Sequence, residues 1–292
     1  MSRKKTRNRQ LAKVHQRRVA ERRQRQRRRG TTIAVALIVG FLGLALVFFA
    51  FVRGGGEETP AAASPSATPS ESASPSPPGE PGVRTGTVDP EPGPTEVACG
   101  GEVPKGADVP KPQFAAPAQV LEQGKTYTAT LQTSCGDIVI ELLAKQAPET
   151  VNSFVFLAEQ GFFDGQRFHR LDTSIDVIQG GDPTGTGSGS PGYTIPDELT
   201  GEESYGPGVF AMANGGPGTG GSQFFIVTGS DGHLLDDQGA WTIFGDVVEG
   251  LDVAQQIQEL PIQDPEAVAA GDLTGQQPAE AVYLEKVTID SQ

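Results

Sequence analysis

A run of 22 residues without a charged side chain, Thr31 to Val52, limits most strongly what this chain can fold into. As an α-helix it would span about 33 Å, enough to cross the hydrocarbon core of a bilayer. Residues 1–29 carry fourteen Lys or Arg against one Glu, a net charge of +13, whereas the rest carries nine basic and 35 acidic residues, a net charge of −26. Basic flanks stay on the cytoplasmic side of a membrane. The pattern predicts a single-pass membrane protein with a cytoplasmic basic head (1–29), a transmembrane signal-anchor (30–53) and an extracytoplasmic remainder.

The fate of the anchor has two alternatives. A cleaved signal peptide has a shorter apolar core with a small-residue cleavage site close behind it. Here Phe48 to Arg53 follows the apolar run directly, and the small residues Ala61-Ala62-Ala63 lie further on. We therefore expect an uncleaved anchor, and cleavage at Ala61-Ala62-Ala63 is the alternative. The basic head is expected to lie on anionic lipid headgroups. Nucleic acid is not expected as a partner, because no Phe, Tyr or Trp lies among the basic residues and the predicted span follows directly.

Beyond the anchor, residues 54–97 consist mainly of Pro, Ser, Ala, Gly, Thr and Glu. Such a segment cannot bury a core, so it is predicted to be a disordered stalk. A lead-in segment, 98–124, follows it. Cys99 and Cys135 are the only cysteines, and both follow the predicted span. In an oxidising compartment the pair predicts a disulfide, with two free thiols as the alternative. No metal site is predicted, because only His169 and His233 accompany them and no ligand spacing emerges.

Residues 125–290 read as one folded domain in which short β-type runs are separated by turn signals. Strands are expected at Thr126–Thr133, Asp137–Leu142, Gln166–His169, Val177–Gln179, Val209–Ala213, Phe224–Thr228, Trp241–Val247 and Val282–Ile289. One helix is expected after Pro148, with an apolar stripe that ends at Gly161, and a second at Leu251–Leu260. Many short strands with Gly-rich connections and two helices are typical of a β-barrel.

Three local patterns are set aside. Gly187 to Gly192 has the G-x-G-x-x-G spelling of dinucleotide-binding loops, but Pro191 and Pro196 place it in a loop rather than at the start of a helix. Ser222 does not lie in a nucleophile elbow. His169 is expected to be a structural hydrogen-bonding residue rather than a base.

Two separated groups of motifs carry the strongest functional signal. Phe168-His169-Arg170 precedes Gln179-Gly180-Gly181-Asp182-Pro183, and the run from Phe210 to Pro217 leads into Gly221-Ser222-Gln223-Phe224-Phe225-Ile226. In this order, over Lys125 to Ile289, they resemble the cyclophilin family. The resemblance implies a mainly β fold, a closed eight-stranded antiparallel barrel capped by two helices. It also implies peptidyl-prolyl cis-trans isomerase activity on proline-containing polypeptides, without a cofactor and as a monomer.

The residue types fit that activity. A twisted amide has lost its resonance, so a site that excludes water, holds the proline ring and donates to the preceding carbonyl stabilises the transition state. Arg170 is the predicted donor, and Gln179 is predicted to hold backbone or the guanidinium. A charge-assisted hydrogen bond contributes about 1.5–3 kcal/mol, whereas a ten-thousandfold acceleration needs about 5.5 kcal/mol. Desolvation and ring positioning must therefore supply the rest.

The resemblance and the residue types together assign the site. The predicted catalytic residues are Arg170, Gln179 and Phe225. The predicted substrate-binding residues are Val177, Met212, Ala213, Asn214, Gln223, Leu234 and Trp241.

Two positions depart from the family pattern. The linker from Leu171 to Asp176 is one residue longer than the common one and lacks its Pro-Gly-Phe, so Ile175 or Asp176 replaces the pocket phenylalanine. Trp241 stands where the family has a pocket histidine, and it is either a wall of the pocket or a core residue. We therefore predict a membrane-tethered isomerase that assists the folding of exported proteins. The alternative is a tethered chaperone or scaffold of the same fold that binds proline segments with little catalysis.

Overall fold

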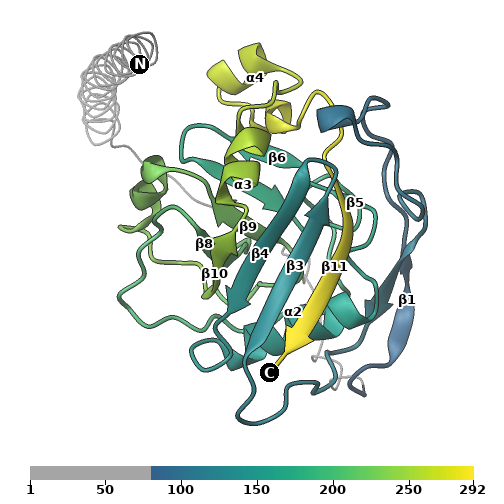
Figure 1. The fold of residues 1–292 in the computed structure, drawn as a ribbon, viewed down its shortest axis with the longest axis vertical. Coiled ribbons are helices and arrows are strands. Elements are labelled where there is room, and N and C mark those ends of the chain that lie inside the picture. Colours follow the sequence, from purple (N-terminus) through teal and green to yellow (C-terminus); the bar gives the residue numbers. More distant parts are fainter. Residues whose placement is uncertain (1–79) are drawn as a thin grey trace, which may run out of the picture. The chain divides into compact units, whose positions relative to one another are not determined.

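The computed structural model describes residues 80–292 (Figure 1). The predicted basic head, the signal-anchor at Thr31 to Val52 and most of the predicted stalk lie outside this range. Within residues 80–292, no helix is both long and apolar enough to cross a membrane.

The domain is built on a nine-stranded sheet in which all neighbouring strands are antiparallel. The strand order is β5-β11-β3-β4-β10-β8-β9-β7-β6. The strands are β3 (Tyr127–Thr133), β4 (Gly136–Leu142), β5 (Gln166–Arg167), β6 (Arg170–Asp172), β7 (Val177–Gly180), β8 (Val209–Met212), β9 (Phe224–Val227), β10 (Ile243–Glu249) and β11 (Tyr283–Ser291).

Local sequence explains the two kinds of strand. In β3 every second residue is buried, because alternate side chains of a strand point to opposite faces and only one face meets the core. In contrast, all four residues of β8 and all four of β9 are buried. These strands carry apolar side chains on both faces because a second apolar cluster covers their outer side.

The prediction of a closed eight-stranded barrel was wrong, because the sheet curls into a half-barrel. Its edge strands β5 and β6 are consecutive in the chain, and within residues 80–292 no ladder joins them. Only Phe168 and His169 separate them, so both strands run in one direction along a continuous segment and cannot pair with each other as a hairpin. Phe168 N–H donates to Val282 O (2.9 Å), whereas His169 N–H donates to Gln179 O (3.0 Å). The segment therefore changes partners at this point.

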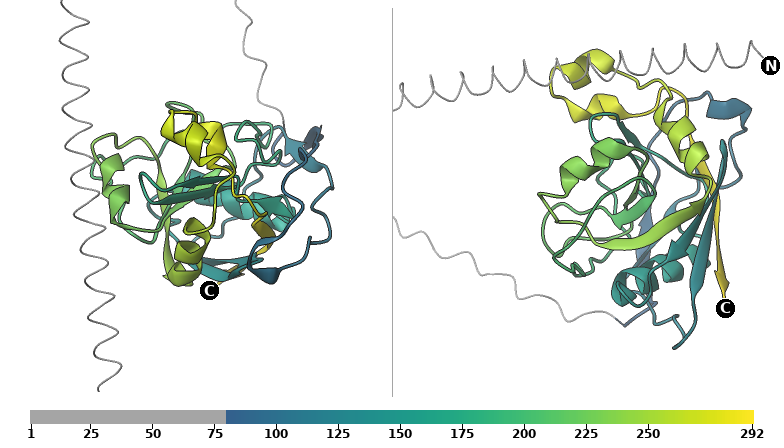
Figure 2. Two further views of the ribbon diagram at one scale, coloured as in Figure 1. Left: turned by 90° about the horizontal axis from the view of Figure 1, so that it is seen from above. Right: turned by 60° about the vertical axis from the view of Figure 1, so that its left-hand side comes forward.

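Helices lie toward both ends of the curled sheet (Figure 2). α2 (Pro148–Glu159) inserts Phe154 among Phe163, Phe210, Phe224 and Phe244, with ring centroids 4.9–5.9 Å apart. α3 (Leu251–Gln258) packs against β4, β6 and β7. These are the two expected helices, and α4 (Pro265–Ala269) is a third, short one.

The start of α2 is capped from a distant loop. Ala147 at the N-cap offers no side-chain acceptor. Instead, Glu198 accepts from the Glu149 N–H (3.0 Å) and the Thr150 N–H (2.8 Å). A carboxylate at this end also complements the positive end of the helix dipole.

The described residues include the end of the predicted stalk and the lead-in segment. β1 (Arg84–Val88) lies in the predicted stalk and pairs with β2 (Lys111–Phe114) in the lead-in segment. Lys111 is buried and donates to the carbonyls of Gly106 and Asp164, which ties this segment to the sheet. Buried and exposed residues do not alternate in either strand, so the sequence pattern does not reveal them.

Candidate active site

A row of four residues crosses adjacent strands on one face of the sheet. Arg170 on β6 lies opposite Gln179 on β7, Gln179 lies opposite Phe225 on β9, and Phe225 lies opposite Ala211 on β8. Residues directly opposite each other in neighbouring strands share a face. The antiparallel pairing thus brings the three predicted catalytic residues, Arg170, Gln179 and Phe225, side by side.

Apolar side chains next to this row form a cluster separate from the main core. We call it the outer cluster. Its buried members are Val177, Tyr205, Val209, Ala211, Phe225, Val227 and Leu235, and Ile175, Ala213, Trp241 and Ile243 pack against them half-buried. Apolar surface beside a row of polar groups is what a site for a proline ring and its peptide carbonyl requires.

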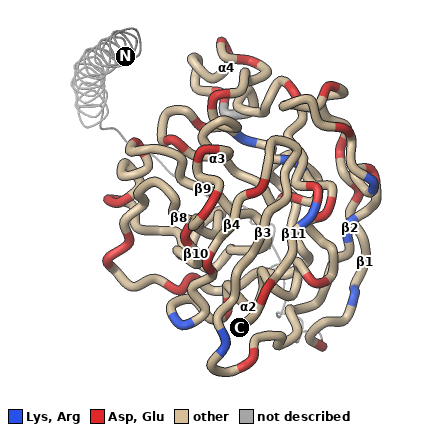
Figure 3. The backbone as a smooth tube through the Cα atoms, in the orientation of Figure 1, with Lys and Arg blue, Asp and Glu red and all other residues tan. Residues whose placement is uncertain are grey.

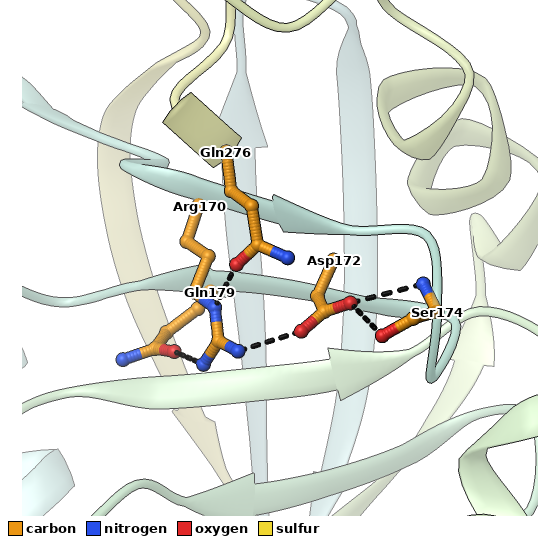
Figure 4. Close-up of polar contacts among 5 residues, drawn as sticks. All are labelled: Arg170, Asp172, Ser174, Gln179 and Gln276. Atoms are coloured by element: carbon orange, nitrogen blue, oxygen red, sulfur yellow. Dashed lines mark hydrogen bonds and ion pairs between the residues drawn. The ribbon is translucent and has the colours of Figure 1, made fainter. Parts of the chain in front are cut away.

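The guanidinium of Arg170 is held by three acceptors (Figure 4). Its Nε donates to Gln276 Oε1 (2.7 Å), its Nη1 to Gln179 Oε1 (3.2 Å) and its Nη2 to Asp172 Oδ2 (2.6 Å). The side chain remains 30% exposed. A guanidinium has five N–H groups, so two have no acceptor among the described residues.

Asp172 is ionised beside this guanidinium. Burial raises the pKa of its carboxyl, but the hydrogen bonds from Ser174, the positive charge of Arg170 and the Gln276 amide outweigh burial, so the pKa lies below its ordinary value. Ser174 donates to Asp172 Oδ1 through its N–H (2.9 Å) and its hydroxyl (2.6 Å).

A chain of amides continues from Arg170 to the Gly-rich loop. Gln179 Nε2 donates to Gln223 Oε1 (2.9 Å), and Gln223 Nε2 donates to the carbonyls of Gly187 and Gly189 (3.0 Å each). These bonds orient both amides and present the Gln179 oxygen to Arg170. Gly187 and Gly189 lie in the loop that has the G-x-G-x-x-G sequence pattern, so this loop holds the side chain of Gln223 in place.

Three aromatic rings meet at the other end of the outer cluster. Trp241 packs edge-on against Tyr205 (5.9 Å between centroids) and Phe225 (6.2 Å). The Tyr205 hydroxyl donates to Trp241 O (2.7 Å) and accepts from Trp241 N–H (3.1 Å), and burial raises its pKa to about 12. Trp241 thus lies half-buried in the outer cluster and not in the main core.

Asn214 uses its side chain to join loops around the site. Its Nδ2 donates to Ala240 O (2.7 Å) and to Asp197 Oδ1 (3.3 Å). This places Asn214 and its neighbour Ala213 next to the segment that carries Trp241.

Two predicted substrate-binding residues lie elsewhere. Met212 is 3% exposed and belongs to the main core, because it alternates with Ala211 and Ala213 along the strand and points to the opposite face. Leu234 is 53% exposed, and its neighbour Leu235 joins the outer cluster instead. The two-residue period of a strand predicts that Met212 points to the core. No such pattern predicts that Leu235 rather than Leu234 is buried, because both lie in the short 3-10 helix η2 (Ser230–Leu235).

The question left open between Ile175 and Asp176 is decided by their packing. Ile175 packs against the outer cluster. Asp176 has a left-handed backbone (φ 51°), and its Oδ2 accepts from the Asp231 N–H (3.0 Å). Ile175 therefore stands where the resemblance implies an aromatic residue.

Substitutions at these two positions are expected to act oppositely. Ile175→Phe should increase kcat/KM for proline peptides, because it adds aromatic surface beside the proline ring. Asp176→Phe should lower the free energy of unfolding by about 1–3 kcal/mol, because an aromatic residue is strained at positive φ and the Asp231 N–H loses its acceptor. An isomerisation assay and urea unfolding measure both. Higher activity of Asp176→Phe at parental stability would contradict this placement.

His169 does not make the hydrogen bonds that the sequence predicted for it. It is buried, and within the described part of the chain neither ring nitrogen has a partner. Burial lowers its pKa to about 4. Its backbone, which joins β5 to β6, is what positions Arg170.

The surroundings of the site are acidic. The stretch between Arg170 and Lys286 forms most of the site, and it contains no Lys or Arg. Figure 3 shows Asp and Glu along the loops beside β8 and β10. Glu202 and Asp237 are exposed there.

A cleft of about 730 Å³ lies away from these residues. It is formed by the segment around Gln119 to Lys125, the start of α2 and the segment Thr194 to Pro196. It shares no residue with the outer cluster, so it does not enlarge the site.

Comparisons with known proteins agree with this arrangement. Residues 128–288 match the sequence model of the family described as "Cyclophilin type peptidyl-prolyl cis-trans isomerase/CLD". Peptidyl-prolyl cis-trans isomerase A of Mycobacterium tuberculosis (strain ATCC 25618 / H37Rv) is 41% identical over 181 residues, 56% of this chain and 92% of that protein. The chain belongs to the cyclophilin-type peptidyl-prolyl cis-trans isomerases. The family assignment made from the motifs is thereby confirmed.

Two further relatives support the family and the fold. Peptidyl-prolyl cis-trans isomerase ppi1 of Schizosaccharomyces pombe is 46% identical over 131 residues, 44% of this chain and 82% of that protein. The crystal structure of a cyclophilin-type isomerase of Cryptosporidium parvum is similar with a TM-score of 0.50 at 30% identity, covering 57% of this chain and 99% of that one. The domain is thus a cyclophilin-type isomerase domain.

The sequence did not predict several contacts of the candidate site. Asp172 lies two residues after Arg170 on a strand, so the shared face was a usable signal. Tyr205 lies in an irregular loop, and Gln276 is 106 residues from Arg170, so neither had a local signal.

Proposed function

We propose that this cyclophilin works on the outer side of the cytoplasmic membrane, tethered by residues 30–53, and assists the folding of exported proteins. The charge asymmetry around Thr31 to Val52 carries the proposal: +13 before the uncharged run and a strongly acidic chain after it. A basic head held in the cytoplasm by the positive-inside rule leaves the isomerase domain outside. Membership of a family of isomerases supports catalysis over a holding module of the same fold.

In the mechanism that we propose, the outer cluster around Phe225 receives the proline ring of a substrate. The two free N–H groups of Arg170 then lie beside the X-Pro amide. As the amide twists it loses resonance, and its nitrogen regains a lone pair that can accept a hydrogen bond, so a fixed donor beside that nitrogen acts most strongly in the transition state. Gln179 keeps the guanidinium in place. No bond to the protein forms or breaks.

Protease treatment of intact cells tests the topology. Protease should cut the segment between the anchor and residue 80 and release the acidic domain without lysis, while a cytoplasmic marker stays intact. A domain protected until the cells are lysed would reverse the assignment. Deleting residues 1–53 should give a soluble isomerase, and a variant that stays in the membrane fraction would remove the anchor from the proposal.

The cysteine pair is expected to form a disulfide in this location. The structure places Cys99 beside Cys135, 36 positions apart in the sequence and with Cα atoms 5.1 Å apart, a distance that a disulfide can span. Reduction should lower the free energy of unfolding by about 3–4 kcal/mol, because closing a loop of this length restricts the unfolded chain. Denaturation with and without reductant measures the change. A Cys99→Ala, Cys135→Ala double variant should not respond to reductant, and two titratable thiols in the native protein would contradict the pairing.

The acidic surroundings predict a preference among substrates. Peptides with Lys beside the X-Pro bond should have a higher kcat/KM than matched peptides with Glu, because an acidic field attracts cationic ligands. The ratio should shrink as salt rises, since the screening length falls to about 3 Å at 1 M. Glu202→Gln with Asp237→Asn should reduce the ratio, whereas Glu285→Gln on β11 should not. A ratio that does not change with salt would contradict an electrostatic origin.

A further inference from the structure

A closed segment between α3 and β11 brings a glutamine to Arg170 from 106 residues away. Residues 262–278 begin and end together, because Ile262 and Pro278 form an antiparallel bridge and Gln263 N–H donates to Gln277 O (2.8 Å). The 3-10 helix η3 (Leu273–Gln276) ends this segment and lies against β6. Gln276 is buried, and its Oε1 accepts from the Nε of Arg170 (Figure 4).

Asp172 holds the same guanidinium from another direction. Its side chain is 5% exposed, and Oδ2 lies 2.6 Å from Arg170 Nη2. Its second oxygen accepts both the N–H and the hydroxyl of Ser174, so the carboxylate cannot turn away from Arg170 without losing these bonds. Asp172 is thus itself fixed before it fixes its partner.

Acceptors on all three nitrogens define the plane and the rotation of the guanidinium. Gln276 meets Nε, Gln179 meets Nη1 and Asp172 meets Nη2. An unrestrained arginine samples many rotamers, so fixing it when substrate binds costs conformational entropy. Here the rotamer is already fixed in the folded protein. A donor that does not reorganise during the reaction stabilises a transition state most strongly.

We propose that Gln276 and Asp172 are positioning residues of the isomerase reaction. They act through Arg170: together they hold the guanidinium so that its two remaining N–H groups face the bound X-Pro amide. Segment 262–278 is then part of the catalytic apparatus, although it contributes no group to the substrate. The inference deepens the isomerase activity and does not depend on the membrane location.

Gln276→Met tests the proposal, because Met keeps the length and packing but cannot accept a hydrogen bond well. We expect kcat/KM to fall about 10-fold to 100-fold, since small misplacement of a catalytic group has effects of this size. The loss should appear in kcat with KM unchanged. Gln276→Glu, which keeps an oxygen acceptor for Nε but replaces the amide group beside Asp172 with a second carboxylate, should restore only part of the activity. Gln277→Ala is the matched control in the same segment, because the Gln277 side chain pairs with Gln263 and not with Arg170.

A readout that does not use activity separates positioning from folding. The Nε–H proton of Arg170 should exchange slowly with water in the parent and in Gln277→Ala, and fast in Gln276→Met, at equal melting temperature. Parental kcat in Gln276→Met, or equal losses in Gln276→Met and Gln277→Ala, would overturn the proposal.

A double-mutant cycle tests whether the two residues act together. Asp172→Asn should also lower kcat, and combining it with Gln276→Met should lower kcat by less than the product of the two single losses, because both act through one guanidinium. Losses that multiply would show independent effects and would remove the shared role.

Discussion

Arg170→Ala should leave the domain folded while lowering kcat/KM for isomerisation of proline peptides by about 100-fold or more, as expected when a transition-state donor is removed. The side chain lies at the sheet edge and is 30% exposed, so little core packing is lost. Asp172 would lose its partner but keep both bonds from Ser174. We therefore expect a loss of stability of only about 1–3 kcal/mol. A peptide isomerisation assay and thermal unfolding measure the two effects.

Arg170→Lys separates charge from geometry. An ammonium keeps the positive charge, but a single nitrogen cannot meet Gln276, Gln179 and Asp172 together and still serve a substrate. We expect activity close to that of Arg170→Ala. Arg167→Ala is the control on neighbouring β5, because Arg167 donates to Glu91 O (2.6 Å) outside the site. Parental activity in Arg170→Ala would remove Arg170 from the mechanism.

The site could be predicted to the extent that its residues follow strand rules. Arg170, Gln179 and Phe225 lie in motifs on strands that pair with one another, so motif order and antiparallel pairing together place them in one row. The same rule, applied at Met212, would have sent that side chain to the core. Asp172 follows it too, since it shares a face with Arg170.

The remaining contacts depend on irregular backbone. Leu235 joins the outer cluster through a 3-10 helix, and Gln276 reaches Arg170 through a segment closed by its own hydrogen bonds. The 3-10 helix has only six residues, too few for its period to stand out in the sequence, and the closed segment has no regular period. Asp176 illustrates the same limit, because its left-handed backbone turns the carboxylate toward Asp231, and only the folded loop reveals this.

Closure of the sheet was also beyond the strand pattern. Each of the eight predicted strands has a counterpart in the structure, but β6 was interpreted as part of a linker. That strand is the second half of a segment whose first half pairs with β11. Such a segment can close a barrel, or its two halves can form the two opposite edges of an open sheet. The hydrogen bonds of Phe168 and His169 decide between these outcomes, and the two-residue period of a strand does not specify them.

Trp241→Ala should raise KM for proline peptides or lower turnover, because Trp241 packs on Phe225 at the end of the outer cluster. Truncating a fully buried Trp costs about 3–5 kcal/mol, but this side chain is only half-buried, so we expect a smaller loss of stability. The two hydrogen bonds of Tyr205 to residue 241 go to its main chain, so they survive the substitution. Trp241→Phe is the matched control and should retain most of the affinity, since an aromatic wall remains.

The fluorescence of this single tryptophan offers an independent measurement. Binding of a proline peptide should change its emission, because the ligand would displace water from the exposed part of the indole. In Arg170→Ala the emission change should persist at higher peptide concentration, since the apolar wall is intact and only the donor is missing. An emission that does not respond to saturating peptide, together with normal KM in Trp241→Ala, would show that Trp241 supports the cluster without touching the substrate.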